Sequence, residues 1–412
     1  MMTLQEAYEQ LKAAADSAER TSLLRTWCLD QDEQIAYFLW CACLHRWYDD
    51  YYFCFIAETL FQIPQDYGLG YYNELMLLDF DLAEDHYQAI ILHKVGEFYR
   101  DAGLREFALE ALSQAAEHQR VVTDVNPEFP DERRFLTVLL NQTGDIYFEF
   151  SRFADALENY SSSLAIATEL SKDEPEKELW RWDVSVCHSK QGAVYEKQER
   201  YAQALEHFRT SLKIAEEICE GAELNPEWMA ALCVCYERLA HLHRKMGERQ
   251  DALKYFEEDY EIAQELRDSD PGNPQWEWKV SISLNNLGDV CREMGNRQRA
   301  FEHYEQALEI RERLSEADKG NMGWRWSLCV SLWRVAEGYE HQQGCEKKAR
   351  DNWQRLLDII EKIDAPGLQE KIDKVWKPYA KDRIKKLNEK LGEVAVDEHG
   401  IPEDDGPLEV SF

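Results

Sequence analysis

The chain has few of the residues that interrupt helices, with 19 glycines and 11 prolines among 412 residues. It also lacks any run of 18 apolar residues, and no basic segment followed by an apolar core stands at its N-terminus. The first absence favours a helical protein, because glycine and proline are the least favourable residues inside a helix. The second argues against a membrane-spanning helix and a secretory signal.

Basic residues are scarce as well. The chain has 47 lysines and arginines against 80 aspartates and glutamates, so its net charge is −33. A surface of this sign repels the phosphate backbone, and we therefore expect no direct contact with nucleic acid. The lack of a long apolar run gives the expectation of no membrane partner. It favours a well-solvated surface or a basic protein partner.

The 11 cysteines show no disulfide framework and no zinc-site spacing. Cys233 and Cys235 are separated by one residue, as are Cys41 and Cys43, and on a helix the two thiols of such a pair diverge by about 200°. The sequence also lacks a phosphate-binding glycine loop and a G-x-S-x-G motif. We expect a reduced, cytoplasmic protein that is not an enzyme and holds no metal or cofactor.

What the sequence does contain is a period of 48 residues. It is clearest in residues 271–321, where two amphipathic helices are joined by a turn at residues 294–296. Small residues in the first helix keep the period at Gly96, Gly144, Gly192, Ala240, Gly288 and Ala336. The second helix repeats a small residue followed four positions later by a large one, as at Ala156 and Tyr160 or Ala300 and Tyr304. Two helices approach closely only where a side chain is nearly absent, so each small position predicts a helix contact with a large residue beside it.

Tryptophans share the register at the start of each first helix, at Trp180, Trp228, Trp276 and Trp324. Large apolar residues in register indicate packing between repeats rather than ligand stacking. Cys187 and Cys235 are in register with Ser283 and Ser331, which indicates a packing position for small residues. In the last unit Gly344 lengthens the turn by one residue, since Ala349 and Trp353 restore the pattern one position late.

The ends of the chain differ from the repeats. Residues 1–86 are interpreted as a divergent helical cap, and residues 31–90 hold 15 aromatic residues, which leaves a docking surface open as an alternative. Residues 365–391 predict a basic capping helix whose apolar side includes Val375, Trp376 and Tyr379. Residues 392–412, with seven acidic residues and no lysine or arginine, predict a flexible acidic tail.

The spacing of Gly144, Tyr147, Ala156 and Tyr160, and of their equivalents from Gly192 and Gly288 onward, matches a known signature. Over residues 87–364 the chain resembles the tetratricopeptide repeat family, with six repeats of about 48 residues in a style similar to bacterial members. The usual unit has about 34 residues, so each helix is expected to be longer by about 7 residues, or about 10 Å. The resemblance implies an all-α, right-handed superhelical solenoid of antiparallel helix pairs.

The family also implies a concave groove, lined by the first helix of each pair, that binds peptides or helices of partner proteins. The positions one after, three before and four after each small anchor residue are expected to face it. Among them we predict partner-binding residues at Asn141, Asp145, Glu237, His241, Arg244, Asn285, Asp289, Arg292, Trp333 and Glu337. The pairs Asn141–Asp145 and Asn285–Asp289 are the most groove-like, because an amide and a carboxylate together can hold a peptide backbone. The lysine-and-asparagine clamp that grips a terminal carboxylate in some relatives is not evident.

The sequence therefore predicts a non-enzymatic scaffold or regulator that binds a partner protein or peptide in the groove. Two alternatives within the family are a peptide-sensing switch and a regulatory subunit of a bacterial defence or signalling complex with a protease or nuclease. A third alternative is an enzyme with an unrecognised site in residues 31–90. Self-association through the apolar ends of the array is left open.

Overall fold

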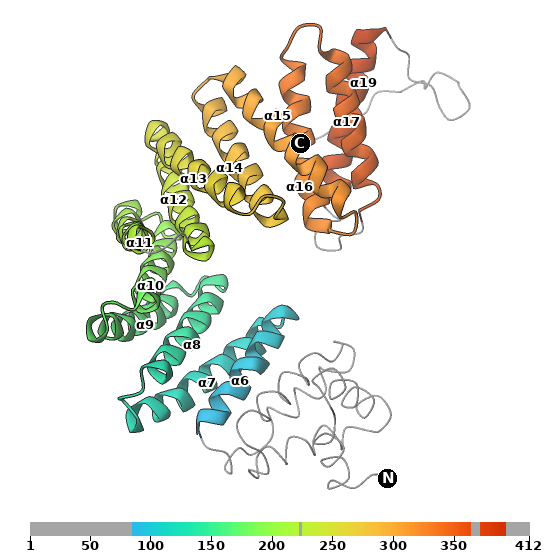
Figure 1. The fold of residues 1–412 in the computed structure, drawn as a ribbon. Helices are drawn as coiled ribbons and strands as arrows, with labels where there is room; N and C mark the ends of the chain where they lie inside the picture. Colours follow the sequence, from blue (N-terminus) through green and yellow to red (C-terminus); the bar gives the residue numbers. More distant parts are fainter. Residues whose placement is uncertain (1–84, 222–224, 364–370, 393–412) are drawn as a thin grey trace, which may run out of the picture. The chain divides into compact units, whose positions relative to one another are not determined.

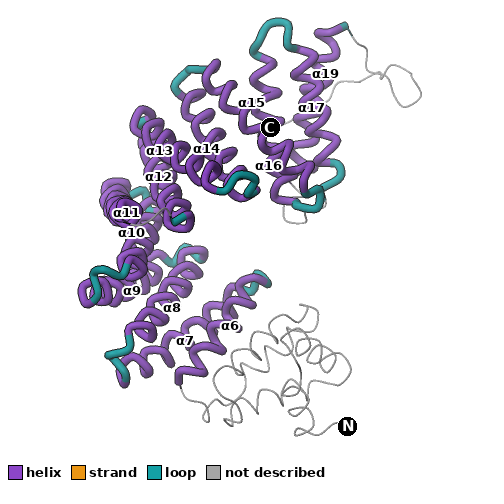
Figure 2. The backbone as a smooth tube through the Cα atoms, viewed as in Figure 1, coloured by secondary structure: helices purple, strands orange, loops and turns teal. Residues whose placement is uncertain are grey.

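The computed structural model describes residues 85–221, 225–363 and 371–392, and these form helices joined by short loops without a strand (Figures 1 and 2). The body of the expected N-terminal cap, most of the aromatic region 31–90 and nearly all of the expected acidic tail lie outside the described residues. None of the described helices is long and apolar enough to cross a membrane.

The chain divides into two compact units, residues 1–200 and 201–412. The described helices of the first unit are α6 (Asp85–Asp101), α7 (Arg105–Val125), α8 (Pro130–Glu149), α9 (Phe153–Asp173) and α10 (Glu178–Lys197). Each helix from α6 to α9 packs against the next one along the chain. Because the connecting turns are short, successive helices are antiparallel.

The second unit continues the same arrangement. Its described helices are α11 (Tyr201–Gly221), α12 (Pro226–Met246), α13 (Arg249–Ser269), α14 (Pro274–Glu293), α15 (Arg297–Ala317), α16 (Met322–Glu340), α17 (Glu346–Ile360), the π-helix η1 (Ile372–Trp376) and α19 (Lys377–Leu391). Consecutive helices from α11 to α17 pack on one another, and α19 packs on α17 (Figure 1). The all-α architecture of helix pairs predicted from the sequence is confirmed.

The 48-residue register is confirmed by the helix bounds. The second helices of four successive units, α9, α11, α13 and α15, begin at residues 153, 201, 249 and 297. The last second helix, α17, begins at Glu346, one residue late, as the position of Gly344 predicts. The helices are long, with 20 residues in α8 and 21 in α9.

The starts of the first helices α12, α14 and α16 have a local cause. Side-chain oxygens of Asn225, Asn273 and Asn321 accept hydrogen bonds from backbone N–H groups in the first turns of α12, α14 and α16. These bonds satisfy donors that have no partner within the helix. Proline in the first turn of α12 and α14 adds a fixed φ at a position where its missing N–H costs nothing.

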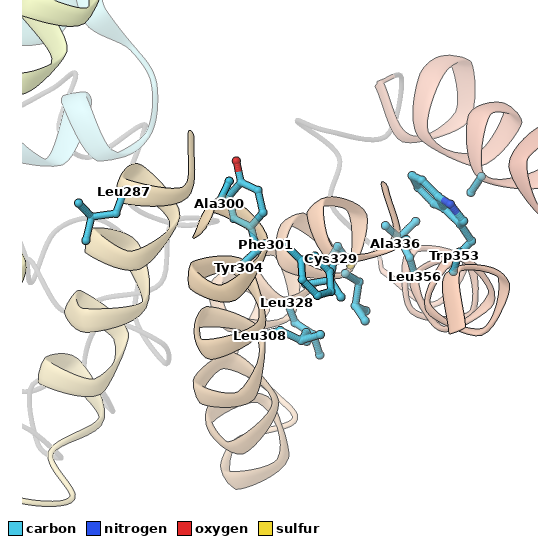
Figure 3. Close-up of a cluster of buried hydrophobic side chains, with 14 of the residues drawn as sticks. Leu287, Ala300, Phe301, Tyr304, Leu308, Leu328, Cys329, Ala336, Trp353 and Leu356 are labelled. Atoms are coloured by element: carbon cyan, nitrogen blue, oxygen red, sulfur yellow. The ribbon is translucent and has the colours of Figure 1, made fainter. Parts of the chain in front are cut away.

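The small anchor residues act as the sequence predicts. A Cβ added at Gly144 would lie 2.5 Å from Cε1 of Tyr160, and one added at Gly288 would lie 2.3 Å from Cε1 of Tyr304. Glycine thus lets each first helix approach the aromatic ring of its partner helix. Phe301 and Tyr304 continue into a buried cluster that reaches Trp353 (Figure 3).

The tryptophans and small polar residues in register are packing residues, which confirms that prediction. Trp276 and Trp324 pack against a buried cluster that contains Leu266 and Leu314. Cys187, Cys235, Ser283 and Ser331 are all buried. These positions stabilise the stack.

The C-terminal helix differs from its prediction at Val375 and Tyr379, both of which are exposed. Ile372, Ala380 and Leu387 are buried, but the Val375 side chain, expected on the apolar side, is 51% exposed. The cause is the π-helical turn η1, which has more residues per turn than an α-helix and so rotates Val375 away from the packed face.

Candidate functional site

A pocket of about 890 Å³ lies in the second unit and is lined by residues of α14, α15, α16 and α19. Four of the ten residues predicted for the groove line it, namely Asp289, Arg292, Trp333 and Glu337. The first helices α14 and α16 therefore supply a common concave surface, with the start of α15 and the cap α19 as its other walls.

Aromatic rings form the apolar part of this pocket. Trp333 stacks on Tyr379 of α19, with ring centroids 4.6 Å apart and an interplanar angle of 13°. Phe301 packs so closely on α16 that a Cβ added at Gly338 would lie 2.2 Å from its Cδ2 atom. Trp333 also meets the buried ring of Trp353 edge to face at 5.1 Å. These contacts hold the aromatic wall in place.

The pocket carries a charge balance opposite to that of the chain. Its lining includes four arginines against three carboxylates: Arg292, Arg297, Arg334 and Arg383, with Asp289, Glu337 and Glu340. Local net charge is thus positive in a chain of net charge −33. The first turn of α15 adds backbone N–H groups, whose dipoles also favour an anion.

Two of these arginines form ion pairs with carboxylates that line the pocket. Arg334 donates to Asp289 at 2.7 Å, and Arg383 pairs with Glu340. Arg292 and Arg297 are exposed. A hydrogen bond to Tyr304, together with nearby carboxylates, raises the pKa of Arg292, and Arg297 has no ion pair among the residues that the structure describes. These two guanidinium groups are available to a ligand.

Asp289 has a different role from the one its position suggests. Its Oδ1 accepts a hydrogen bond from the Tyr304 hydroxyl at 2.8 Å, and its Oδ2 accepts from Arg334 at 2.7 Å. The Arg334 guanidinium also lies over the Tyr304 ring, 5.4 Å from its centroid. Burial, reinforced by Asp289, raises the pKa of Tyr304. The carboxylate thereby joins three successive helices, α14, α15 and α16.

The first unit repeats this arrangement 144 residues earlier. Asp145 accepts from the Tyr160 hydroxyl at 2.7 Å and from Lys190 Nζ at 2.6 Å. The Lys190 ammonium lies 5.7 Å from the centroid of the Tyr160 ring. We call this set of an aspartate, a tyrosine and a basic residue the aspartate clamp. It connects one helix pair to the first helix of the next pair.

The two predicted asparagines also have internal partners. Asn285 is 3% exposed, and its amide donates to the Ser281 carbonyl at 2.9 Å. Asn141, in the first unit, approaches Cys187 Sγ at 3.7 Å. The structure therefore gives both amides a packing role.

The remaining predicted residues lie on α12. Arg244 donates to Glu293 at 2.7 Å, and this bond lowers the pKa of the Glu293 carboxyl. Glu237 accepts from Lys279 at 2.7 Å, and the ring of His241 meets Phe256 at 5.1 Å. All three lie outside the pocket lining.

Several residues that line the pocket are not among the partner-binding residues predicted from the sequence. Arg334 lies two residues before an anchor, Arg297 opens a second helix, and Tyr379 and Arg383 follow the repeats. None occupies a position that the family assigns to the groove. The one signal in the sequence is the cluster of arginine in a chain poor in basic residues.

Among the described residues one group approaches a metal-binding geometry. One ligand atom from each of His243, Glu248 and Asp251 lies within 4.8 Å of the others. His243 Nδ1 is hydrogen-bonded to Glu248 at 2.6 Å, but its Nε2 is buried without a partner. A metal-bound histidine normally donates its second N–H to an acceptor, so this arrangement fits a histidine–carboxylate hydrogen bond rather than a metal site.

The buried thiols of Cys187, Cys233 and Cys329 are not poised for nucleophilic chemistry. Burial raises the pKa of the Cys187 and Cys233 thiols and raises the pKa of Cys329 to about 12. A reactive cysteine needs the thiolate, which these surroundings disfavour.

A family model described as "Tetratricopeptide repeat" matches residues 279–324, which include most of α14, all of α15 and part of the pocket. Residues 279–324 are a tetratricopeptide repeat. A second model, "Protein of unknown function (DUF2753)", matches residues 181–277 of this repeat protein. No curated protein matches the sequence.

Solved structures with a similar fold include a signal transduction ATPase with numerous domains from Pyrococcus horikoshii, which has a tetratricopeptide repeat sensor. The match has a TM-score of 0.53 at 13% identity and covers 95% of this chain and 49% of that one. BtubC from P. vanneervenii matches with a TM-score of 0.47 at 19% identity, covering 75% and 98% of the two chains. The quorum sensor NprR from B. thuringiensis matches with a TM-score of 0.48 at 12% identity, covering 94% and 87%. At these identities the first match supports the repeat fold alone.

Proposed function

We propose that this tetratricopeptide repeat protein is a non-catalytic interaction protein that binds a segment of a partner protein in the pocket of α14, α15, α16 and α19. The observation that carries the proposal is the convergence of four groove positions on one cavity of about 890 Å³. Concave sites with apolar walls and a few directed polar groups are typical of ligand-binding pockets.

The pocket supports a division of roles. The rings of Phe301, Trp333 and Tyr379 offer an apolar surface to a side chain of the partner. Arg292 and Arg297 lie beside this surface and donate to carbonyl or carboxylate oxygens. The basic partner favoured by the net charge of −33 would meet the acidic exterior, whereas the segment inside the pocket would present acceptors.

A second candidate, regulation by a bound peptide, is favoured by the construction of the wall. Helix α19 contacts α16 through the Tyr379–Trp333 stack and the Arg383–Glu340 pair. A peptide that competes for Trp333 would therefore change the packing of α19. Hydrogen exchange across residues 377–391 would separate this switch from a rigid scaffold, since a scaffold shows no change there on peptide binding.

The test is affinity capture from the native cell followed by mass spectrometry, with three versions of the full chain. One is wild type, one carries Arg292→Glu and Arg297→Glu, and the control carries Arg209→Glu and Lys213→Glu. Arg209 and Lys213 are exposed residues of α11 outside the pocket lining, so the control has the same charge change.

We expect at least one protein to be captured by the wild type and the control but lost with the pocket variant. Removing two charge-assisted hydrogen bonds would weaken binding by about a hundredfold or more, given about 1.5 kcal/mol or more for each bond. If every captured protein is retained by the pocket variant, the pocket is not the binding site. Loss with both variants would indicate a general charge effect instead.

A further inference from the structure

We propose that the pocket of α14, α15, α16 and α19 is occupied in the free protein by the chain's own C-terminal segment, residues 393–412. A partner would then have to displace this segment to bind. Because this regulation acts on the site of the proposed function, it rests on that function.

The first reason is charge complementarity. Residues 393–412 contain seven carboxylate side chains and no lysine or arginine. The pocket has a locally positive lining within an acidic chain, and its exposed Arg292 and Arg297 are left without a carboxylate partner at bonding distance among the described residues. A short acidic segment is attracted to such a place, and the surrounding acidic surface repels it from other places.

The second reason is the point at which the segment leaves the fold. Tyr379 and Arg383 of α19 line the pocket, and the same helix ends at Leu391. Along the helix, Arg383 and Leu391 are about 12 Å apart at 1.5 Å per residue. Twenty residues span at most about 70 Å when extended, so residues 393–412 have ample length to reach Arg292 and Arg297.

The third reason is the match of apolar groups. Leu408, Val410 and Phe412 follow six of the seven acidic residues of the segment. The wall of Phe301, Trp333 and Tyr379 provides the aromatic surface that such side chains require. The segment therefore carries both kinds of group that the pocket can bind, namely carboxylates for its arginines and apolar side chains for its aromatic rings.

The experiment measures the binding of a fluorescent synthetic peptide, residues 393–412, to four full-length proteins by anisotropy. These are the wild type, a neutral-tail variant in which all seven acidic residues of 393–412 become the corresponding amides, and two neutral-tail variants with added changes. One of these adds Arg292→Glu and Arg297→Glu, and the other adds Arg209→Glu and Lys213→Glu as the matched control.

The peptide should bind the neutral-tail protein at least about tenfold more tightly than the wild type, because a tethered segment competes at an effective concentration near the millimolar range. The Arg292→Glu and Arg297→Glu pair should abolish this binding, the control pair should retain it, and added salt should weaken it. Equal affinity for wild type and neutral-tail protein, or no binding to either, would overturn the proposal. Self-association of the wild type that disappears in the neutral-tail variant would also overturn it, since the segment would then occupy a second copy.

Failure here can be distinguished from failure of the proposed function. If partner capture depends on Arg292 and Arg297 but is the same for wild type and neutral tail, the pocket binds its partner without regulation by residues 393–412. If the peptide binds as expected while no captured protein depends on these arginines, the segment occupies the pocket but the proposed function is wrong.

Discussion

The aspartate clamp allows a sharp test, because the same set of groups occurs twice with different burial. Replacing Asp289 with alanine removes acceptors from the Tyr304 hydroxyl and the Arg334 guanidinium, in a site where the Asp289 side chain is 11% exposed. Hydrogen bonds that involve a charged group contribute about 1.5–3 kcal/mol each. Arg334, at 26% exposure, recovers part of its loss from water, so we expect the substitution to cost about 3–4 kcal/mol.

The matched substitution is Asp145→Ala in the first unit. Its carboxylate is 38% exposed, and its basic partner is Lys190. Water replaces more of the lost interaction there, since exposed ion pairs contribute about 0–1 kcal/mol. With the tyrosine hydrogen bond included, we expect a cost of about 1–2 kcal/mol.

Urea unfolding, followed by circular dichroism, measures both costs from the shift in midpoint at a constant slope. A double-mutant cycle of Asp289→Ala with Arg334→Ala should give a coupling of about 1–2 kcal/mol. Equal costs for the two aspartates, or a coupling below about 0.5 kcal/mol, would refute the role assigned to burial. Loss of partner binding in Asp289→Ala would then have to be explained by direct contact rather than by altered repeat packing.

Three further outcomes are expected. Gly288→Ala should destabilise the protein by about 1–3 kcal/mol in thermal melts, because its Cβ would overlap the Tyr304 ring. In a chain that already carries Tyr304→Ala, the Gly288→Ala substitution should no longer destabilise. An unchanged loss of stability would contradict the contact. Ser151 has a φ of 59°, so Ser151→Gly should raise the free energy of unfolding by about 0.5–1 kcal/mol. Gly295 has a φ of 85°, so Gly295→Ala should lower it by a similar amount. Changes of the opposite signs would contradict the left-handed turn. Burial lowers the pKa of His303 from 6.5, so the unfolded chain takes up a proton more readily than the folded one and stability falls as the pH drops below that value. Between pH 7 and 5, the melting temperature of His303→Leu should therefore fall less than that of the wild type. An equal fall would be inconsistent with the lowered pKa.

The fold could be predicted from the sequence because residues that begin, end and pack the helices recur at equivalent positions of the units. An asparagine cap starts a helix at residues 225, 273 and 321, and a residue with positive φ ends the first helix near residues 103, 151, 199, 247 and 295. Small and aromatic residues then fix the contact between helices. The residue with positive φ recurs every 48 residues in five units and the asparagine cap in three, so the bounds of one unit predict those of the others.

The pocket could be predicted only in part. The groove positions implied by the family include four residues that line the pocket, Asp289, Arg292, Trp333 and Glu337. A position in the repeat does not show, however, which neighbouring residues its side chain contacts. Burial of Asn285 and pairing of Arg244 depend on neighbouring helices, and periodicity alone carries no information about these partners. The contribution of α19 depends on the packing of a segment outside the repeats.

The aspartate clamp, in contrast, leaves a pattern in the sequence that can be recognised once its geometry is known. Of the six positions that follow the anchors, only two hold aspartate, the others being Glu97, Ala193, His241 and Glu337. In both aspartate units, and in none of the others, a tyrosine stands 15 residues later and a lysine or arginine 45 residues later. The aspartate and the tyrosine occur only together, whereas a basic residue also stands at Arg238, over the ring of Phe208, in a unit without the aspartate.

This co-occurrence separates structural positions from available ones. An aspartate that appears only with its tyrosine and its basic residue is accounted for by the contact between helix pairs. The position four residues after the anchor behaves differently, because it holds Arg100, Phe148, Glu196, Arg244, Arg292 and Glu340 in the six units. Such variation has no constant partner in the repeat. Within the pocket, Arg292 is the exposed member of this series, and partner selection by the protein should therefore depend on Arg292 more than on the deeper Asp289.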